Sequence, residues 1–116
     1  MTQDPRMQLA ARALARSRRL VVFTGAGVSK ESGIATFREP ETGLWARYDP
    51  MELATCEAYV RQPEFVWSWY EHRFGAAAAA APNPGHTAIA ELERILPKVS
   101  VVTQNIDGLH QRAGSS

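Results

Sequence analysis

The chain has 116 residues, 45% of them hydrophobic and 22% charged, which is the composition of a single globular unit. Its formal net charge of +1 favours neither a direct nucleic-acid binder nor an acidic tail, and no run reaches the roughly 20 apolar positions of a membrane span. The single cysteine, Cys56, excludes an internal disulfide and a four-thiolate metal site, and with no visible secretory signal it favours a cytoplasmic setting.

The first predicted element is a helix from Met7 to Ser17, because Met7, Ala10 and Leu14 recur at helical spacing. Basic residues outnumber acidic ones around it: Arg6, Arg12, Arg16, Arg18 and Arg19 stand against Asp4. The pattern indicates a first helix with a basic outer face, although an Arg-rich amphipathic start is also typical of a mitochondrial presequence.

A short strand from Leu20 to Thr24 follows, and its continuous apolar run is typical of a parallel sheet covered on both faces. It leads into Gly25-Ala26-Gly27, which opens a short helix near Gly33. Such a turn suits a dinucleotide, since the glycines let the backbone approach a pyrophosphate and free N–H groups face the anion. Lys30 breaks the strict G-x-G-x-x-G spacing, so a plain structural turn stays an alternative.

Thr36-Phe37-Arg38 adds chemistry that a plain turn does not need. An arginine can bind phosphate oxygens in a bidentate way, and a neighbouring aromatic ring can shield a reactive sugar carbon from water. The alternatives are a surface ion pair for Arg38 and a core position for Phe37.

Two helices are predicted in the middle of the chain, from Met51 to Val60 and from Pro63 to Phe74, with Asp49 as the N-cap of the first and Pro50 at its first position. Six alanines from Ala76 to Ala81 either extend the second helix or form a linker before Pro-Asn-Pro-Gly.

Tyr70 and Arg73 are three residues apart and therefore share one face of the second helix. A phenol hydroxyl and a guanidinium together can receive a carboxylate through charge-assisted hydrogen bonds. A packed tyrosine beside a solvent-facing arginine is the alternative.

An amphipathic helix is predicted from Gly85 to Leu96, and a second strand from Lys98 to Thr103. The order of helices and strands along the chain indicates an α/β fold with a parallel sheet.

Polar residues crowd the carboxyl end of this second strand, from Gln104 through Asn105 to Asp107. In open parallel sheets ligands bind at that end, and these side chains can hydrogen-bond to an amide or a ribose hydroxyl. Turn chemistry closed by Gly108 is the alternative for this segment.

Taken together, the blocks GAGVS, SGI and FR between Gly25 and Arg38, and TQNIDGLH and AG between Thr103 and Gly114, resemble the signatures of the sirtuins, which are NAD-dependent protein lysine deacylases. The resemblance implies a Rossmann-like parallel sheet with helices on both faces. It also implies a small zinc-binding module, which this chain does not contain. In the implied reaction the acyl oxygen attacks the nicotinamide ribose, giving nicotinamide, free lysine and an O-acyl-ADP-ribose.

The resemblance also implies which residues act. Asn105 and Asp107 would be catalytic, and Tyr70 and Arg73 would bind the acylated lysine of a protein substrate. The residues that would bind NAD are Gly25, Ala26, Gly27, Ser29, Thr36, Phe37, Arg38, Trp45, Gln104, Asn105, Ile106 and Asp107.

Two features refine the expected substrate. Thr36 stands where the family usually has Asp, which resembles the branch that removes acidic acyl groups. The spacing Tyr70-x-x-Arg73 resembles that of sirtuins that prefer succinyl- and malonyl-lysine. We therefore expect a desuccinylase or demalonylase with weaker deacetylase activity. The alternatives are a non-catalytic NAD- or ADP-ribose-binding module and a mono-ADP-ribosyltransferase.

The family's general-base histidine and zinc cysteines are not among these residues. His110 belongs to the second block, His86 is expected to be a structural residue at a helix start, and Cys56 is not a zinc ligand. Residues 1–116 are therefore expected to be the N-terminal part of a catalytic domain. We expect this part to be inactive alone, with Zn²⁺ bound only in a longer protein.

Overall fold

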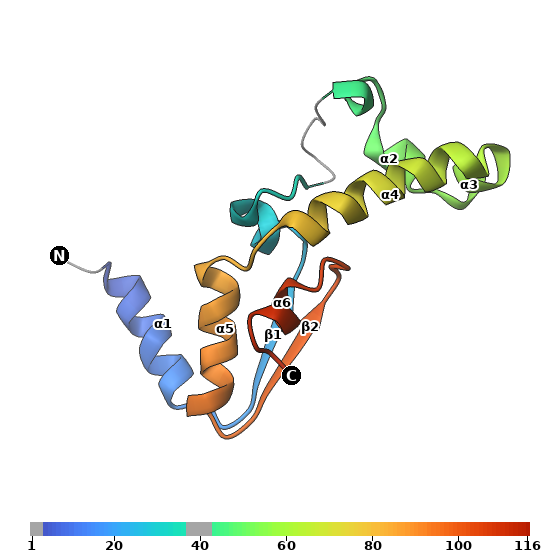
Figure 1. Ribbon diagram of the computed structural model, residues 1–116. Coiled ribbons are helices and arrows are strands. Elements are labelled where there is room, and N and C mark those ends of the chain that lie inside the picture. The colour runs from blue at the N-terminus through green and yellow to red at the C-terminus, as the bar shows by residue number, and fades with distance from the viewer. Residues whose placement is uncertain (1–3, 37–42) are drawn as a thin grey trace.

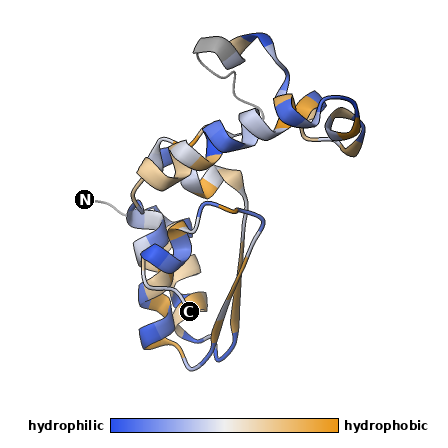
Figure 2. Ribbon diagram, turned by 45° about the vertical axis from the view of Figure 1, so that its right-hand side comes forward, coloured by the Kyte–Doolittle hydropathy of each residue, from blue (hydrophilic) through white to orange (hydrophobic). Residues whose placement is uncertain are grey.

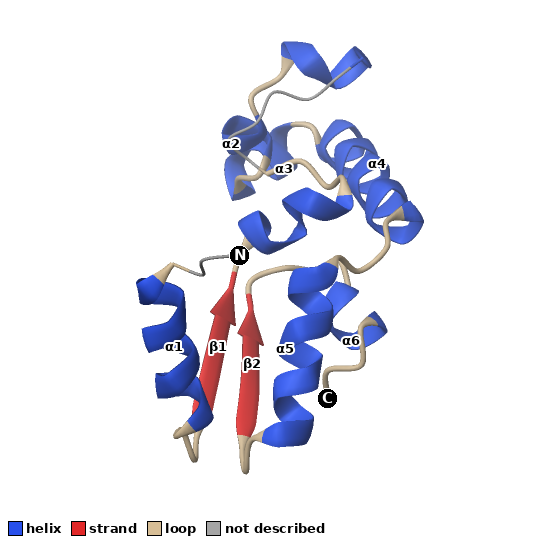
Figure 3. Cartoon of the chain, turned by 90° about the vertical axis from the view of Figure 1, so that its left-hand side faces the viewer, coloured by secondary structure: helices blue, strands red, loops and turns tan. Residues whose placement is uncertain are grey.

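The computed structural model describes residues 4–36 and 43–116, and its centre is a two-stranded parallel sheet. Strands β1 (Leu20–Thr24) and β2 (Val99–Thr103) pair residue for residue along their whole length. The Gln104 N–H extends the pairing by donating to the Thr24 carbonyl at 3.0 Å. Because the strands run the same way, their carboxyl ends lie at one edge of the sheet (Figure 3).

Helices α1 (Pro5–Ala15) and α5 (Pro84–Ile95) lie on one side of the two strands (Figures 1 and 3). The short helix α6 (Leu109–Arg112) follows β2 and packs against α5. This order confirms the predicted α/β fold with a parallel sheet. Within the described residues, no helix has the length and apolarity that crossing a membrane requires.

The long helix α4 (Pro63–Ala79) extends away from the sheet and carries the short helices α2 (Pro50–Leu53) and α3 (Cys56–Arg61) at its far end (Figure 1). A 3₁₀ helix, η2 (Gly43–Arg47), precedes them. The radius of gyration is 17.5 Å, whereas a compact chain of this length has about 13 Å. The arrangement is therefore open, and much apolar surface stays in contact with solvent.

The strands are exposed on one face, which corrects the prediction that they are covered on both. Leu20, Val22 and Thr24 point toward the helices, whereas Val21 and Phe23 are 66% and 67% exposed. Figure 2 shows the apolar strand ribbons with no helix on their outer side. The physical reason is that the helices of this chain which flank the strands lie on the same side of the sheet.

The first helix is confirmed, but it begins two residues earlier than predicted. The Asp4 side chain caps it by accepting from the Arg6 N–H at 2.9 Å, and Pro5 occupies the first turn, where its missing N–H costs nothing. None of its residues is buried, and Met7 and Leu9 are about as exposed as Val21. The apolar stripe of α1 therefore has no core to cover it in this chain.

The predicted helix from Met51 to Val60 is wrong in one respect, because the structure divides it into α2 and α3. The Thr55 hydroxyl donates to the Glu52 carbonyl and accepts from the Ala58 N–H, both at 3.1 Å, so it ends one helix and caps the next. Asp49 is the N-cap of α2, as predicted. The alanines extend α4 as far as Ala79, which decides between the two alternatives for that run.

The start of α5 is fixed by a reciprocal cap. The Asn83 side chain accepts from the Gly85 N–H at 2.9 Å, and the His86 ring accepts from the Asn83 N–H at 3.1 Å. The Asn83 amide also donates to the Val28 carbonyl at 2.8 Å and to the Ser32 hydroxyl at 3.0 Å. One buried side chain thus ties α5 to the segment that follows β1, and His86 has the structural role that its position predicted.

We expect Asn83→Ala to lower the free energy of unfolding by about 2–3 kcal/mol, because it removes a helix cap and also the bond to the partly buried Val28 carbonyl. The matched control is Asp49→Ala, because Asp49 is the N-cap of α2 and its side chain accepts from the Met51 N–H of the same helix. This change should cost about 1 kcal/mol. Urea denaturation compares the two variants, and equal losses would show that the bonds from Asn83 to Val28 and Ser32 contribute nothing.

Candidate active site

Two loops meet at the carboxyl edge of the sheet. The first continues from β1 into the 3₁₀ helix η1 (Ala26–Ser32), which ends at Gly33 with φ +85°, a conformation that glycine adopts without strain. The second runs from Gln104 to Gly108, between β2 and α6. The loops are about 80 residues apart in sequence, as the bond between Asn105 and Gly25 shows, and the parallel pairing of the strands places them side by side.

The hydroxyl of Ser29 links these two loops. Ser29 is 1% exposed, and its Oγ donates to Asp107 Oδ2 at 2.6 Å. The Asn105 side-chain amide donates to Ser29 Oγ at 3.3 Å, and His86 Nε2 lies 3.3 Å from the same hydroxyl oxygen. Side chains from η1, from the second loop and from α5 therefore converge on one buried oxygen.

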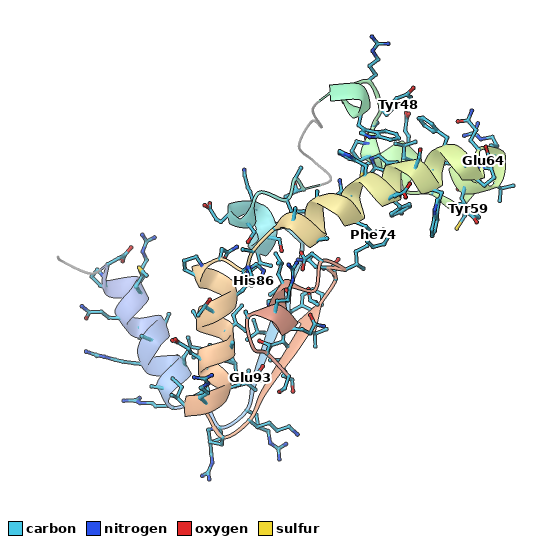
Figure 4. All side chains as sticks on the ribbon, in the orientation of Figure 1. Tyr48, Tyr59, Glu64, Phe74, His86 and Glu93 are labelled. Carbon is cyan, nitrogen blue, oxygen red and sulfur yellow. The ribbon has the colours of Figure 1, made fainter. Side chains whose placement is uncertain are left out.

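The direction of these bonds follows from the neighbours of His86, which lies at the start of α5 (Figure 4). Because His86 Nδ1 accepts from the Asn83 N–H, the proton of the neutral ring resides on Nε2. Nε2–H therefore donates to Ser29 Oγ, which in turn donates to Asp107. This series of hydrogen bonds ends at the Asp107 carboxylate, and each donor in it has an acceptor.

The side chains of Asn105 and Asp107 have fixed orientations. The Asn105 amide donates to the Gly25 carbonyl at 2.9 Å as well as to Ser29, so the side-chain oxygen is the atom available to a ligand. Asp107 Oδ1 accepts from the N–H of Leu109, the first residue of α6, at 2.9 Å. Protein groups thus hold both side chains in place before any ligand binds, which is the condition for a preorganised site.

A second buried histidine supports the strand ends. His110 is 3% exposed, and its Nε2 lies 2.8 Å from the Thr24 hydroxyl, which donates to Thr103 at 2.8 Å. The Thr103 hydroxyl also accepts from the Asn105 N–H at 3.0 Å. His110 therefore connects to the ends of both strands through the two threonine hydroxyls. Its ring packs edge-on against the His86 ring, with the centroids 5.0 Å apart.

Burial lowers the pKa of His86 below its ordinary value of 6.5, and the neighbouring His110 lowers it further, while the Asp107 carboxylate partly opposes both effects. The ring therefore stays neutral at pH 7, as the direction of its hydrogen bonds requires.

A cavity of about 590 Å³ opens beside this network, which is within the range of small-molecule sites. Both loops line it, together with one face of α4. Its lining residues are Ala26, Ser29, Lys30, Gly33, Ile34, Ala35, Tyr70, His72, Arg73, Phe74, Ala76, Ala77, Gln104, Asn105, Ile106 and Asp107.

Tyr70 and Arg73 contribute the α4 side of the cavity. The Arg73 guanidinium donates to the Ala35 carbonyl at 3.2 Å and lies over the Trp69 ring, 5.1 Å from its centroid. Arg73 is half-buried, so the alternative of a solvent-facing arginine does not hold. The Tyr70 ring packs edge-on against Trp69, with the centroids 4.8 Å apart.

Residues 25–116 match the family model described as the Sir2 family. The chain belongs to the Sir2 family. The match includes both loops, the α4 face and the buried histidines.

Individual Sir2-family proteins are about half or more identical to this chain over most of its length. NAD-dependent protein deacylase 2 of Pyrobaculum aerophilum is 61% identical over 102 residues, covering 88% of this chain and 41% of the relative. NAD-dependent protein deacylase 1 of Pseudomonas aeruginosa is 54% identical over 109 residues, covering 94% and 44%. A crystal structure of a Sir2 homologue–NAD complex superposes with a TM-score of 0.83 at 50% identity, covering 94% and 42%. The chain thus spans less than half the length of these relatives.

Several residues that the sirtuin resemblance assigned to NAD lie outside the cavity lining. Trp45 lies in an aromatic cluster, with its ring centroid 6.0 Å from Tyr48, 5.5 Å from Phe65 and 6.0 Å from His72. Gly25 contributes through its carbonyl to Asn105, whereas Gly27 and Thr36 are not among the lining residues. Phe37 and Arg38 lie outside the described residues.

The sequence reasoning missed Lys30 and His72 in the lining, and it missed the positioning role of Asn83. The signal for Asn83 is present, because Asn before Pro is a helix-start pattern, but the helix start predicted at His86 was not given Asn83 as its cap. Across residues 4–36 and 43–116, no group of three or more His, Cys, Asp or Glu side chains is arranged to hold a metal ion.

The buried neutral ring of His86 makes stability depend on pH. Because its folded-state pKa lies below 6.5, the unfolded chain binds the proton more readily, and stability should be full above pH 6.5 and fall as the pH is lowered toward the folded-state pKa. His86→Gln, which keeps an amide donor but does not titrate, should lack this part of the pH dependence. Urea denaturation of both proteins between pH 7.5 and about pH 5 measures the difference, and parallel curves would contradict a buried neutral His86.

Proposed function

We propose that the protein removes acyl groups from protein lysines with consumption of NAD, and that it prefers acyl groups that carry a carboxylate, such as succinyl and malonyl. The observation that carries the proposal is a single cavity with two chemically different ends. The strand-end loops with Asn105 and Asp107 form one end, and Tyr70 with Arg73 forms the other.

Three observations support NAD as the co-substrate. The cavity lies at the carboxyl edge of a parallel sheet, where open α/β folds bind nucleotides. Its lining offers the Asn105 amide oxygen and the Asp107 carboxylate, which suit the hydroxyl groups of a ribose. The relatives are named NAD-dependent deacylases, and one solved homologue is an NAD complex.

NAD, when bound, would supply an electrophilic ribose carbon and nicotinamide as the leaving group. Asn105 would accept a hydrogen bond from the ligand through Oδ1, because both bonds of its NH₂ group go to protein oxygens. Asp107 would accept from a ribose hydroxyl with the lone pairs that Ser29 and Leu109 leave open, and its negative charge would favour positive charge developing nearby.

The α4 end of the cavity would bind the distal carboxylate of the acyl group. A guanidinium has five N–H donors, so Arg73 can keep its bond to the Ala35 carbonyl and still bind a carboxylate. The Tyr70 hydroxyl can donate to the second carboxylate oxygen. An acetyl group has no carboxylate, so it would gain nothing from either side chain.

The reaction is tested by incubating the full-length protein with NAD and a succinyl-lysine peptide and measuring the products by mass spectrometry. We expect nicotinamide, the free-lysine peptide and O-succinyl-ADP-ribose in equal amounts. An ADP-ribosylated protein would instead indicate a mono-ADP-ribosyltransferase. Binding of NAD without nicotinamide release would indicate a non-catalytic module.

Arg73→Met should reduce desuccinylation while deacetylation is largely retained, because only the acidic acyl group needs the guanidinium. A hydrogen bond to a charged group contributes about 1.5–3 kcal/mol, which corresponds to roughly ten- to a hundred-fold in kcat/KM. Arg94→Met is the matched control, since Arg94 is exposed on α5 and absent from the cavity lining. Equal loss of both activities in Arg73→Met would remove the assignment of acyl preference.

A further inference from the structure

The carboxyl end of α4 is held by a side chain from another helix. The Arg112 guanidinium, at the end of α6, donates to the Ala77 and Ala80 carbonyls, each at 2.8 Å. The same group donates to the Asp107 carbonyl at 3.1 Å. One side chain therefore joins the end of α4 to the backbone of a residue in the strand-end loop.

Helix α4 supplies little of its own to hold this end. Its last turn contains no basic residue, and alanines occupy positions 76 to 79, so no side chain there can form a polar contact. The last carbonyls of a helix lack intrahelical partners and carry the negative end of the helix dipole. The Ala77 carbonyl has only a long bond from the Ala80 N–H, at 3.3 Å, and the cation that donates to it and to the Ala80 carbonyl comes from α6.

The clamped face of α4 is also the face that lines the cavity. Tyr70, Arg73, Ala77 and Ala80 follow one another at spacings of three or four residues, which places them along one side of the helix. Tyr70, Arg73 and Ala77 line the cavity, and Ala77 is also a partner of Arg112. The position of the Ala77 carbonyl therefore sets where Arg73, one turn earlier, stands relative to the loop.

We propose that Arg112 is a positioning residue for acyl recognition, fixing the distance between the Tyr70–Arg73 pair and the Asp107 loop. This inference rests on the proposed function, because a fixed distance matters only if the two ends of the cavity bind the two ends of one acyl group. The bond from Arg73 to Ala35 holds a side chain, whereas the clamp holds the helix backbone. Arg112 thus affects an acidic acyl group, which spans the cavity, more than an acetyl group, which does not.

The test compares Arg112→Met and Arg112→Lys with Arg94→Met in the full-length protein. We measure kcat and KM on succinyl- and acetyl-lysine peptides of one sequence, together with hydrogen–deuterium exchange. For Arg112→Met we expect a loss of roughly ten-fold in kcat/KM on the succinyl peptide, and of less than about three-fold on the acetyl peptide. Amides from Gly75 to Ala80, at the end of α4 and its C-cap, should exchange faster together with those of the Asp107 loop.

Arg112→Lys keeps the charge but not the planar fork, so it should recover only part of the succinyl activity. Because it is the milder change, it also decides the question if Arg112→Met fails to fold. Equal losses on both peptides would show a merely structural role, and unchanged exchange in α4 would show that no clamp exists; either result overturns the inference. A wild-type enzyme without activity on the succinyl peptide would instead overturn the proposed acyl class and the specificity role with it, and the exchange data would then judge the clamp alone.

Discussion

The hydroxyl of Ser29 is the constraint on which the site depends. Ser29 is 1% exposed to solvent. Its hydroxyl accepts a hydrogen bond from His86 and donates one to Asp107. Burying polar groups is unfavourable unless each has a partner, so this network is stable only when both strand-end loops are in register. The parallel pairing of β1 with β2 supplies that register, and the network in turn fixes the side chains that face the cavity. The neutral state of His86 belongs to the same constraint, since a second ring proton would displace the N–H of Asn83.

The polar side chains around Ser29 are hydrogen-bonded to one another, whereas many apolar side chains of the sheet and of α1 are exposed to solvent. Val21 and Phe23 leave one face of the sheet exposed, and α1 buries none of its residues. The preorganisation of the site therefore derives from local hydrogen bonds rather than from a large hydrophobic core. Among the described residues, the few buried apolar side chains are divided among α2, α4, α5 with the residue that follows it, and α6; they are Leu53, Val66, Trp69, Ala90, Leu96 and Leu109. The position of α4 relative to the strand ends is therefore determined by a few specific contacts.

Much of this arrangement could be predicted from sequence, for identifiable reasons. The bounds of the first strand were correct, and the second strand begins at Val99, one residue later than predicted, because short apolar runs next to Gly and Pro leave little freedom. The meeting of the two loops followed from the rule that parallel strands end at one edge. What could not be predicted depends on tertiary contacts: the exposure of Phe23 on the uncovered face of the sheet, the break at Thr55, and the bond from Arg73 to the Ala35 carbonyl. Arg112 is the clearest example, because nothing in its local sequence indicates that its partners lie more than thirty residues away.

The central claim is that both loops bind one dinucleotide, with the acyl group reaching from them to α4. The most direct measurement is a crystal structure of the full-length protein with NAD and a succinyl-lysine peptide. The account is supported if the nicotinamide ribose contacts Asn105 or Asp107 while the succinyl carboxylate contacts Arg73. It is contradicted if the dinucleotide touches only one loop, or if the carboxylate points to solvent while the ribose occupies the site.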